Sequence, residues 1–274
     1  MDTEALELSR TLGQGFHILL PNGLQKDLCE TLESISEITV ALDHYQRGGR
    51  YAPSLPDIIA ARTVAQHRLL SLAPPSADLP QPDECIYNAT RVAALIYSDM
   101  VLFPLPPQAG VKPKLADMLR RALDCCTMQS CWGSHPRLLL WTVVVGGIAA
   151  SSTLHRPWYA SRLHKLSTKL EIYDWELIKK ILSSFLWWDY ICDEPAEKLW
   201  HESDHQRKYG TEWPQHSSPM GRNEESRKCG TGLVTVEVSV TSIEDKPCHL
   251  AKPHVYVADY ERTDYTPAFH LTRR

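Results

Sequence analysis

The sequence has no excess of positive charge. Its 29 lysines and arginines are outnumbered by 33 aspartates and glutamates, which gives a net charge of −4. A general nucleic-acid binder, or a protein that adsorbs to anionic membranes, needs surplus cations to displace counterions from phosphates. The balance therefore argues against both classes, although it leaves room for a protein whose DNA contact is made by another segment or chain.

Long apolar runs are also missing. The most apolar stretch, LLLWTVVVGGIAA from Leu138 to Ala150, has thirteen residues, whereas a helix that crosses a bilayer needs about 20. We therefore predict a buried core helix there and no membrane span. The first residues, MDTEALELSR, contain no basic region followed by an apolar run, so no secretory signal is predicted.

Cysteine is neither dense nor regularly spaced. The eight cysteines are Cys29, Cys85, Cys125, Cys126, Cys131, Cys192, Cys229 and Cys248. At least five of them lie within apolar stretches of helical periodicity. A secreted scaffold held by disulfides would be shorter and richer in cysteine for its length. The distribution indicates a reducing, intracellular compartment.

One group of cysteines invites a metal-site interpretation, because Cys125, Cys126 and Cys131 lie close to His135. Adjacent residues on a helix point about 100° apart, so Cys125 and Cys126 cannot both face one ion. No C-x-x-C pair supports them. We interpret these residues as helical core cysteines and predict no bound metal.

A second group combines carboxylates with histidines, as catalytic or hydrolytic metal sites do: Asp189, Asp193, Glu194, His201 and His205. The four-residue spacing does place Asp189 and Asp193 on one helical face. However, Asp193 is close to Pro195 and suits the start of a helix, and His201 lies at a polar helix end. Capping and solvation explain the group better than catalysis, so no catalytic residue and no cofactor are predicted.

Other site patterns are equally weak. Gly13 and Gly15 in TLGQGF are too few for a phosphate loop, and no strand precedes them. No G-x-S-x-G, H-E-x-x-H or G-K-[ST] pattern occurs. A dispersed set of arginines is interpreted as a solvated face rather than a DNA-binding patch: Arg50, Arg62, Arg68, Arg273 and Arg274.

Helical periodicity dominates the chain up to residue 204. Apolar residues at steps of three and four predict helices over 24–45, 56–72, 83–103, 114–129 and 138–150, then one from Pro157, one over 175–192 and a short one after Pro195. Ser54 and Asp174 are the expected N-terminal caps of the second and seventh of these helices. Strand-like alternation is nearly absent before residue 230. We therefore predict an all-α, multi-helix domain over 24–204, preceded by an N-terminal segment, 1–23.

The character of the sequence changes after His201. Residues 205–274 begin with a polar stretch rich in Gly, Pro and Ser, which is typical of a linker. Leu233–Val240, LVTVEVSV, alternates like a strand, and His254–Tyr260 is a weaker candidate. The two could pair as a hairpin against the helical body, or the whole segment could be a poorly ordered extension. We favour the second interpretation, because two isolated strands are marginally stable.

Three pieces in order carry a resemblance to a known family. They are LLLWTVVVGGIAA at 138–150, RPWYASRLHKLSTKL at 156–170 and DWELIKKILSSFLWWDYICDEPAEKLWHE at 174–202. Together they resemble the C-terminal half of the fungal-specific transcription factor domain, the regulatory region that follows a DNA-binding zinc cluster in many fungal regulators. The preceding helices fit the all-helical plan of the family in outline. The adjacent glycines 146 and 147 predict close helix packing, and the tryptophans are interpreted as apolar anchors between helices.

The family's zinc cluster is missing. Members commonly carry six closely spaced cysteines among lysines and arginines near the N-terminus, whereas Cys29 alone occurs in the first 80 residues. We expect the chain to be a fragment, a truncated product, or a member that has lost its DNA-binding module. Direct DNA binding therefore does not follow from the resemblance.

The resemblance implies a nuclear regulatory module, and not an enzyme, that acts on transcription through a protein partner or a small apolar effector. A helical interaction scaffold with no transcriptional role is the alternative. An enzyme is the third hypothesis, and it would require convergent polar residues in a pocket. The sequence names no ligand-binding residues.

Overall fold

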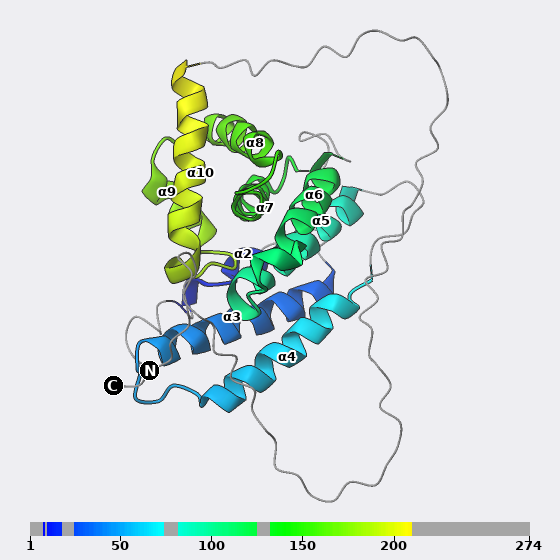
Figure 1. The fold of residues 1–274 in the computed structure, drawn as a ribbon, viewed down its shortest axis with the longest axis vertical. Coiled ribbons are helices and arrows are strands. Elements are labelled where there is room, and N and C mark those ends of the chain that lie inside the picture. Colours follow the sequence, from blue (N-terminus) through cyan, green and yellow to red (C-terminus); the bar gives the residue numbers. More distant parts are fainter. Residues whose placement is uncertain (1–7, 9, 18–24, 74–81, 125–131, 210–274) are drawn as a thin grey trace, which may run out of the picture. The chain divides into compact units, whose positions relative to one another are not determined.

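The computed structural model describes residues 8, 10–17, 25–73, 82–124 and 132–209. Within these residues the chain forms helices and no strand, so the all-α prediction is confirmed (Figure 1). The α-helices are α2 (Gln14–His17), α3 (Lys26–Gln46), α4 (Leu55–Ser71), α5 (Pro82–Tyr97), α6 (Val111–Asp124), α7 (Pro136–Ala149), α8 (Arg156–Lys169), α9 (Trp175–Leu182) and α10 (Asp189–Tyr209). A π-helical turn, η2 (Ser98–Leu102), continues α5, and a 3-10 turn, η3 (Pro107–Ala109), precedes α6.

Two parts of the sequence-based prediction lie wholly or partly outside this range. The possible strands at 233–240 and 254–260 are outside the described residues. Residues 205–209, assigned above to the polar linker, form the last turn of α10. Among the described helices, none combines the length and the apolar character that crossing a membrane requires.

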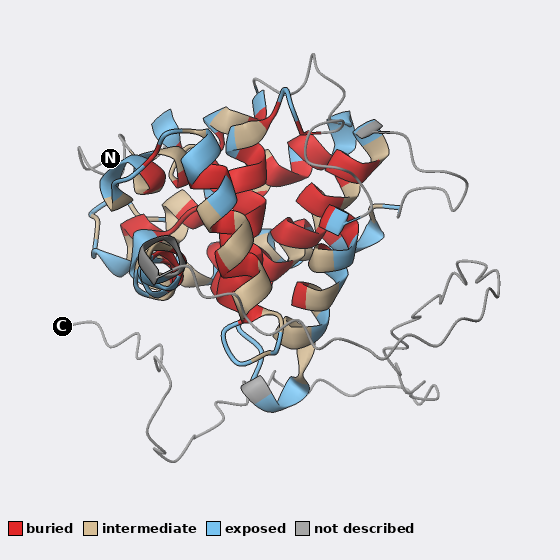
Figure 2. Ribbon diagram, turned by 90° about the horizontal axis from the view of Figure 1, so that it is seen from above, coloured by how far each residue is buried: buried red, intermediate tan, exposed pale blue. Residues whose placement is uncertain are grey.

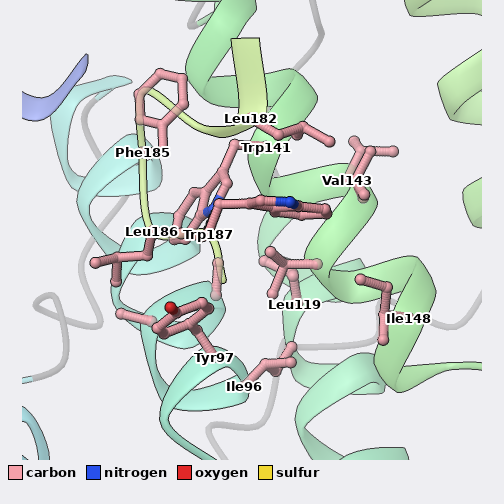
Figure 3. Packing of buried hydrophobic residues seen from close by; sticks show 14 of the residues in the cluster. Ile96, Tyr97, Leu119, Trp141, Val143, Ile148, Leu182, Phe185, Leu186 and Trp187 are labelled. Carbon is pink, nitrogen blue, oxygen red and sulfur yellow. Dashed lines mark hydrogen bonds between the residues drawn. The ribbon is translucent and has the colours of Figure 1, made fainter. Parts of the chain in front are cut away.

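Helix α7 is the centre of the fold. It packs against α5, α6, α8, α9 and α10, and every residue from Leu138 to Ala149 is buried. Figure 2 shows the buried residues gathered in the middle of the helices. Figure 3 shows Trp141 and Val143 of α7 among side chains from α5, α6 and the α9–α10 connection. The prediction of a core helix over 138–150 is therefore confirmed.

The paired glycines of α7 allow its neighbours to approach closely. A Cβ added at Gly146 would lie 2.5 Å from Cε1 of Tyr159 and 2.8 Å from Cδ2 of Leu119. A Cβ at Gly147 would lie 2.3 Å from Cδ2 of Leu199. The close packing expected from this pair is therefore confirmed, and it involves α6, α8 and α10.

The predicted bounds of the last two helices are wrong. Helix α9 ends at Leu182, not at 192, and α10 starts at Asp189 and passes through Pro195 instead of starting after it. Between them, four consecutive large side chains are all buried: Phe185, Leu186, Trp187 and Trp188. The chain is not helical here, and the connection buries all four side chains against the core.

The polar groups of this connection find partners elsewhere in the fold. The N–H of Gly13 donates to the Phe185 carbonyl at 3.1 Å, and the N–H of Gly15 donates to the Ser184 carbonyl at 2.7 Å. Trp141 Nε1 donates to the Leu186 carbonyl at 2.9 Å. These bonds satisfy the backbone that left the helix, and they join the N-terminal segment to the core.

The two expected caps have different outcomes. Ser54 accepts a hydrogen bond from the N–H of Asp57 at 3.4 Å and donates to its carboxylate at 2.5 Å, so the predicted cap of α4 is confirmed. Asp174 occupies the predicted N-cap position of α9 with the extended backbone of an N-cap, but its side chain makes no cap hydrogen bond. The position of this cap is therefore confirmed, and its side-chain hydrogen bond is not.

Candidate functional site

The cysteine candidates do not assemble into a site within the described residues. Cys125, Cys126 and Cys131 lie outside them, and His135 is buried immediately before α7. No group of three His, Cys, Asp or Glu side chains in the described part of the chain is placed to hold a metal ion. Burial raises the pKa of the Cys29 thiol to about 11 and that of the Cys192 thiol to about 12, so neither is a ready thiolate.

Asp189 and Asp193 lie on one face of α10, as their spacing predicted, and they share one partner. Both accept from Nζ of Lys179, at 3.0 Å and 2.6 Å. Asp193 also accepts from Trp187 Nε1 at 2.8 Å. Burial alone would lower the pKa of Lys179, but the two carboxylates outweigh it and raise that pKa well above its ordinary value. The two aspartates thus link α10 to α9 through Lys179. Asp193 lies inside α10 and not at the start of a helix, so the capping interpretation of Asp193 is wrong.

The rest of that acidic group is exposed. Glu194 pairs with Lys198 at 2.7 Å, and His201 lies 3.8 Å from Glu197. His205 is also exposed. The group predicted from the sequence is therefore divided into two parts. Two aspartates link α10 to α9 through Lys179, and the remaining residues lie on a solvated helix face.

One arginine of the dispersed set is only partly exposed to solvent. Arg62 is half-buried, its Nη1 donates to the Leu102 carbonyl at 3.0 Å, and its guanidinium lies 4.6 Å from the centre of the Phe103 ring. The π-helical turn of η2 exposes this carbonyl at the end of α5, and Arg62 binds it. Arg50 and Arg68 are exposed as predicted, whereas Arg273 and Arg274 lie outside the described residues.

A small apolar hollow lies where α6, α7 and α8 meet. A water-sized sphere can reach about 10 Å³ inside it, and it is lined by Leu123, Trp132, Leu139, Val143, Trp158 and Arg162. The Arg162 guanidinium stacks on the Trp158 ring at 4.9 Å, so the charged end of the side chain lies beside an apolar wall. The hollow is therefore a shallow apolar depression with room for about one water molecule.

One wall of the hollow carries an unused hydrogen-bond donor. Trp132 is buried, and its Nε1 has no hydrogen-bond partner in the part of the chain that the structure describes. The other fully buried indoles are satisfied: Trp141 by the Leu186 carbonyl and Trp187 by Asp193. An unpaired buried donor costs about 1–3 kcal/mol, so an occupant with an acceptor could recover that cost.

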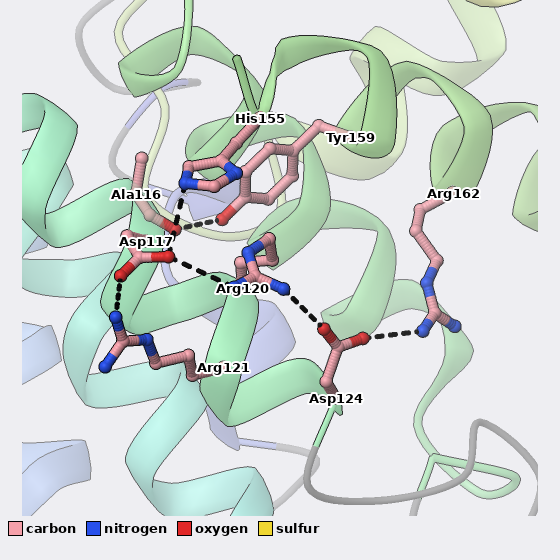
Figure 4. Close-up of polar contacts among 8 residues, drawn as sticks. All are labelled: Ala116, Asp117, Arg120, Arg121, Asp124, His155, Tyr159 and Arg162. Atoms are coloured by element: carbon pink, nitrogen blue, oxygen red, sulfur yellow. Dashed lines mark hydrogen bonds and ion pairs between the residues drawn. The ribbon is translucent and has the colours of Figure 1, made fainter. Parts of the chain in front are cut away.

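A network of ion pairs fixes the rim of the hollow (Figure 4). Asp124, the last residue of α6, binds Arg162 of α8 at 3.0 Å and Arg120 at 3.0 Å. Two turns earlier on α6, Asp117 binds Arg120 at 3.2 Å and Arg121 at 2.6 Å. The buried Tyr159 hydroxyl adds a link, because it donates to the Ala116 carbonyl at 2.6 Å. Arg162 is thus held at the rim by α6.

Arg156 holds the start of α8 in place. Its Nε and Nη2 donate to the carboxylate of Glu202 on α10 at 2.7 Å and 2.9 Å, and its Nη1 donates to the Gly147 carbonyl at 2.6 Å. One guanidinium therefore joins α7, α8 and α10.

The surface of α8 beside the hollow is basic. Trp158, Arg162, Lys165 and Lys169 follow at steps of four, three and four, which places them along one side of the helix. Lys165 and Lys169 are exposed, and neither forms an ion pair with any described residue. This row was not predicted from the sequence, although the spacing of its basic residues is visible in RPWYASRLHKLSTK.

A comparison with protein families matches residues 13–185 to the fungal specific transcription factor domain. The chain belongs to this family. The match covers more than half of the chain and begins well before residue 138, where the resemblance in the sequence becomes strong. It ends at Phe185, so the predicted family ending at 186–202 lies beyond it. No curated protein and no solved structure matches the chain.

The first and last residues of the matched range are hydrogen-bonded to each other, through the Gly13 N–H and the Phe185 carbonyl. The fungal specific transcription factor domain therefore begins and ends at one place in the core. Membership of a transcription factor domain family, which is not an enzyme family, points to a regulatory role in transcription.

Proposed function

We propose that this fungal specific transcription factor domain is a nuclear regulatory module that changes transcription when a partner protein or a small apolar effector binds to it. The observation that carries the proposal is the family match over 13–185, which spans the helical core from α2 to the start of the α9–α10 connection. Contact with DNA is assigned to another module, because the chain carries a net charge of −4.

The size of the hollow favours a protein partner over a free small molecule. Pockets for drug-sized ligands usually have about 300–1,000 Å³, whereas a water-sized sphere can reach only about 10 Å³ inside the hollow. A partner protein needs no such pocket, because it binds across an extended surface.

A tethering experiment tests the proposal. The full chain is fused to an unrelated DNA-binding domain in a fungal host, and transcription of a reporter with the matching operator is measured. We expect the fusion to raise or lower transcription relative to the DNA-binding domain alone at equal protein level. If reporter output is unchanged while the fusion still captures protein partners, the alternative of an interaction scaffold without a transcriptional role replaces the proposal.

A further inference from the structure

The connection from η2 to α6 contains three prolines in four residues: Pro104, Pro106 and Pro107. Proline holds its own φ near about −65°, and the residue before a proline is pushed out of the helical region into the extended one. Leu105 and Pro106 each precede a proline, so the stretch has little conformational freedom. The chain accordingly runs through 104–106 without a turn or a bend. Proline dihedral angles on a straight, extended path are those of a polyproline II helix.

This proline segment lies at the surface. Pro104, Leu105 and Pro106 are all exposed, and Leu105 is 45% exposed. Residues 104–107 include no charged or hydrogen-bonding side chain. The segment therefore presents apolar side chains together with backbone carbonyls, which a polyproline II helix leaves without internal hydrogen bonds.

Both ends of the proline segment are held by the fold. On the side of η2, Arg62 donates to the Leu102 carbonyl at 3.0 Å, and its guanidinium lies 4.6 Å from the centre of the Phe103 ring. On the side of α6, the N–H of Ala109 donates to the Pro106 carbonyl at 2.9 Å. A segment that is already fixed at both ends loses little conformational entropy when a partner binds it.

The spacing of the prolines distinguishes this segment from the other proline pairs of the chain. Pro104 and Pro107 are three residues apart, which places both on one edge of a helix with three residues per turn. The same spacing occurs at one other place, Pro53 and Pro56. There Pro56 lies in the first turn of α4, and Ser54 caps that helix. The second pair thus starts an α-helix, whereas the first pair is joined by an extended stretch.

We propose that the segment 104–107 is a docking site for a folded domain of a partner protein whose groove is lined by aromatic side chains, as in SH3 and WW domains. The rings of Pro104 and Pro107 lie against aromatic side chains of the groove, and donors of the groove bind the free backbone carbonyls. The inference rests on the proposed function, since it names the kind of partner that the regulatory module receives.

The chemistry of the segment favours such a domain over a nucleic acid. Nucleic-acid binding depends mainly on cations that neutralise phosphates, and residues 104–107 carry none. An aromatic groove needs no charge, because it recognises the preformed shape of the polyproline II helix. An exposed, uncharged and rigid segment meets that requirement.

Direct binding with the purified full-length chain tests the site. The probes are purified fungal SH3 and WW domains, immobilised one by one on an array over which the fluorescently labelled chain is passed. We expect at least one domain to bind the chain. An excess of a synthetic proline-rich peptide with the P-x-x-P spacing should weaken that binding at least about tenfold, because both occupy the same groove. An array on which no domain binds, or binding that the peptide leaves unchanged, would overturn the proposal.

Paired substitutions locate the site. Pro104→Ala with Pro107→Ala removes both prolines from one edge of the segment, and we expect at least about tenfold weaker binding of the domain found on the array. The matched control, Pro53→Ala with Pro56→Ala, removes the same residue types at the same spacing and leaves the Ser54 cap in place. It should bind as the unchanged chain does. Equal loss in both double variants, or no loss in the first, would overturn the assignment.

NMR of the unchanged chain tests the position of the site without any substitution. The chain is isotope-labelled, and the domain is added unlabelled. The backbone N–H signals of Leu105 and Ala109 should shift or lose intensity, while those of Ser54 and Asp57 stay in place. Changes at the start of α4 with none at Leu105 would reject the segment 104–107 as the docking site.

These binding measurements do not depend on transcription. Binding of a domain at 104–107 together with an unchanged reporter would reject the proposed function and keep the docking site. A responsive reporter together with no binding domain would keep the function and reject the site.

Discussion

At the scale of the residue, Arg156 illustrates how one buried cation can join three helices. Its side chain is 9% exposed and makes three hydrogen bonds, to the Gly147 carbonyl and to both carboxylate oxygens of Glu202. Glu202 is partly exposed, so water can replace some of its contacts. Removal of the two partners should therefore have unequal effects.

We expect Arg156→Ala to lower the free energy of unfolding by about 2–4 kcal/mol, because it leaves a buried carbonyl without a donor and removes a bidentate pair. Glu202→Gln keeps one acceptor and should cost less than about 1 kcal/mol. Urea unfolding followed by tryptophan fluorescence compares the two. Equal losses of unfolding free energy in the two variants would contradict the buried role of Arg156, because the ion pair with Glu202 would then account for the whole effect.

Gly146→Ala should also destabilise the fold, which is the opposite of the usual effect in a helix. Alanine normally gains about 1 kcal/mol over glycine in a helix. Here the new Cβ would meet the Tyr159 ring at 2.5 Å, and we expect a net loss of about 1–3 kcal/mol from overpacking. Gly147→Ala meets the flexible end of Leu199 and should cost less. A rise in the thermal midpoint of Gly146→Ala would contradict this packing.

The sequence allowed the role of the glycine pair to be predicted but not that of Arg156. Two adjacent glycines inside an apolar run indicate close packing whatever the neighbour is. Arg156 has its partner 46 residues further along the chain, and no local pattern indicates such a pair. The same limit applies to Arg62, whose acceptor is a carbonyl freed by a π-helical turn.

At the scale of the element, η2 places a carboxylate in the core. Asp99 is 5% exposed, and Nζ of Lys112 lies 3.9 Å from one of its oxygens. Burial raises the pKa of Asp99 above its ordinary value, although Lys112 and the backbone of Leu105 offset part of the effect. The folded state therefore binds this proton more tightly than the unfolded chain does.

Asp99→Asn tests the consequence for pH dependence. A raised carboxyl pKa favours the fold below the unfolded pKa of about 3.9 and disfavours it as the pH rises through the folded pKa. We expect the stability of the unchanged chain to fall relative to that of Asp99→Asn as the pH rises above the unfolded pKa of about 3.9. Urea titrations across this range measure the difference.

Asp117→Asn is the matched control with the opposite sign. Burial would raise the pKa of Asp117, but Arg120, Arg121 and His155 outweigh it and lower that pKa. Its contribution is present above about pH 3.9 and is lost as the pH falls through the folded pKa. Asp117→Asn should therefore cost stability at neutral pH and little in acid. The same pH trend in both variants would contradict the two assignments.

Helix periodicity predicted most elements but failed between α9 and α10. The sequence FLWW continues the apolar pattern of α9, so a helix through 175–192 was the natural prediction. The chain leaves the helix there, and its Leu186 carbonyl and Trp188 indole form hydrogen bonds with Trp141 and Asp43, far away in sequence. Such long-range hydrogen bonds are invisible to a local pattern.

At the scale of the whole molecule, helical periodicity predicted the fold class and the resemblance of three sequence pieces predicted the family, but neither predicted the hollow. The hollow is assembled from α6, α7, α8 and Trp132. The basic residues beside it on α8 are not apparent from the net charge of the whole chain, which is negative. The basic row on α8 could have been found by projecting that helix alone. Its position beside Trp158 required the packed structure.

The isolated chain should not bind duplex DNA in a sequence-selective way. The positive surface on α8 offers two free lysines, which is far fewer cations than a specific reader needs. We expect fluorescence anisotropy at about 150 mM salt to show no selective binding tighter than roughly 10⁻⁷ M. Tighter binding to a promoter duplex than to a random duplex would reject the assignment of DNA contact to another module.

The enclosure of α7 also sets the order of events during synthesis. This helix is apolar on all sides, and the last helix to cover it is α10. At about 5–20 residues per second, residues 150–209 take roughly 3–12 s to be made. During that interval α7 is not yet covered by α10. Because the ribosomal exit tunnel still covers the residues made last, nascent chains halted near residue 195 should cross-link to a chaperone through α7, whereas chains extended well past 209 should be released from it.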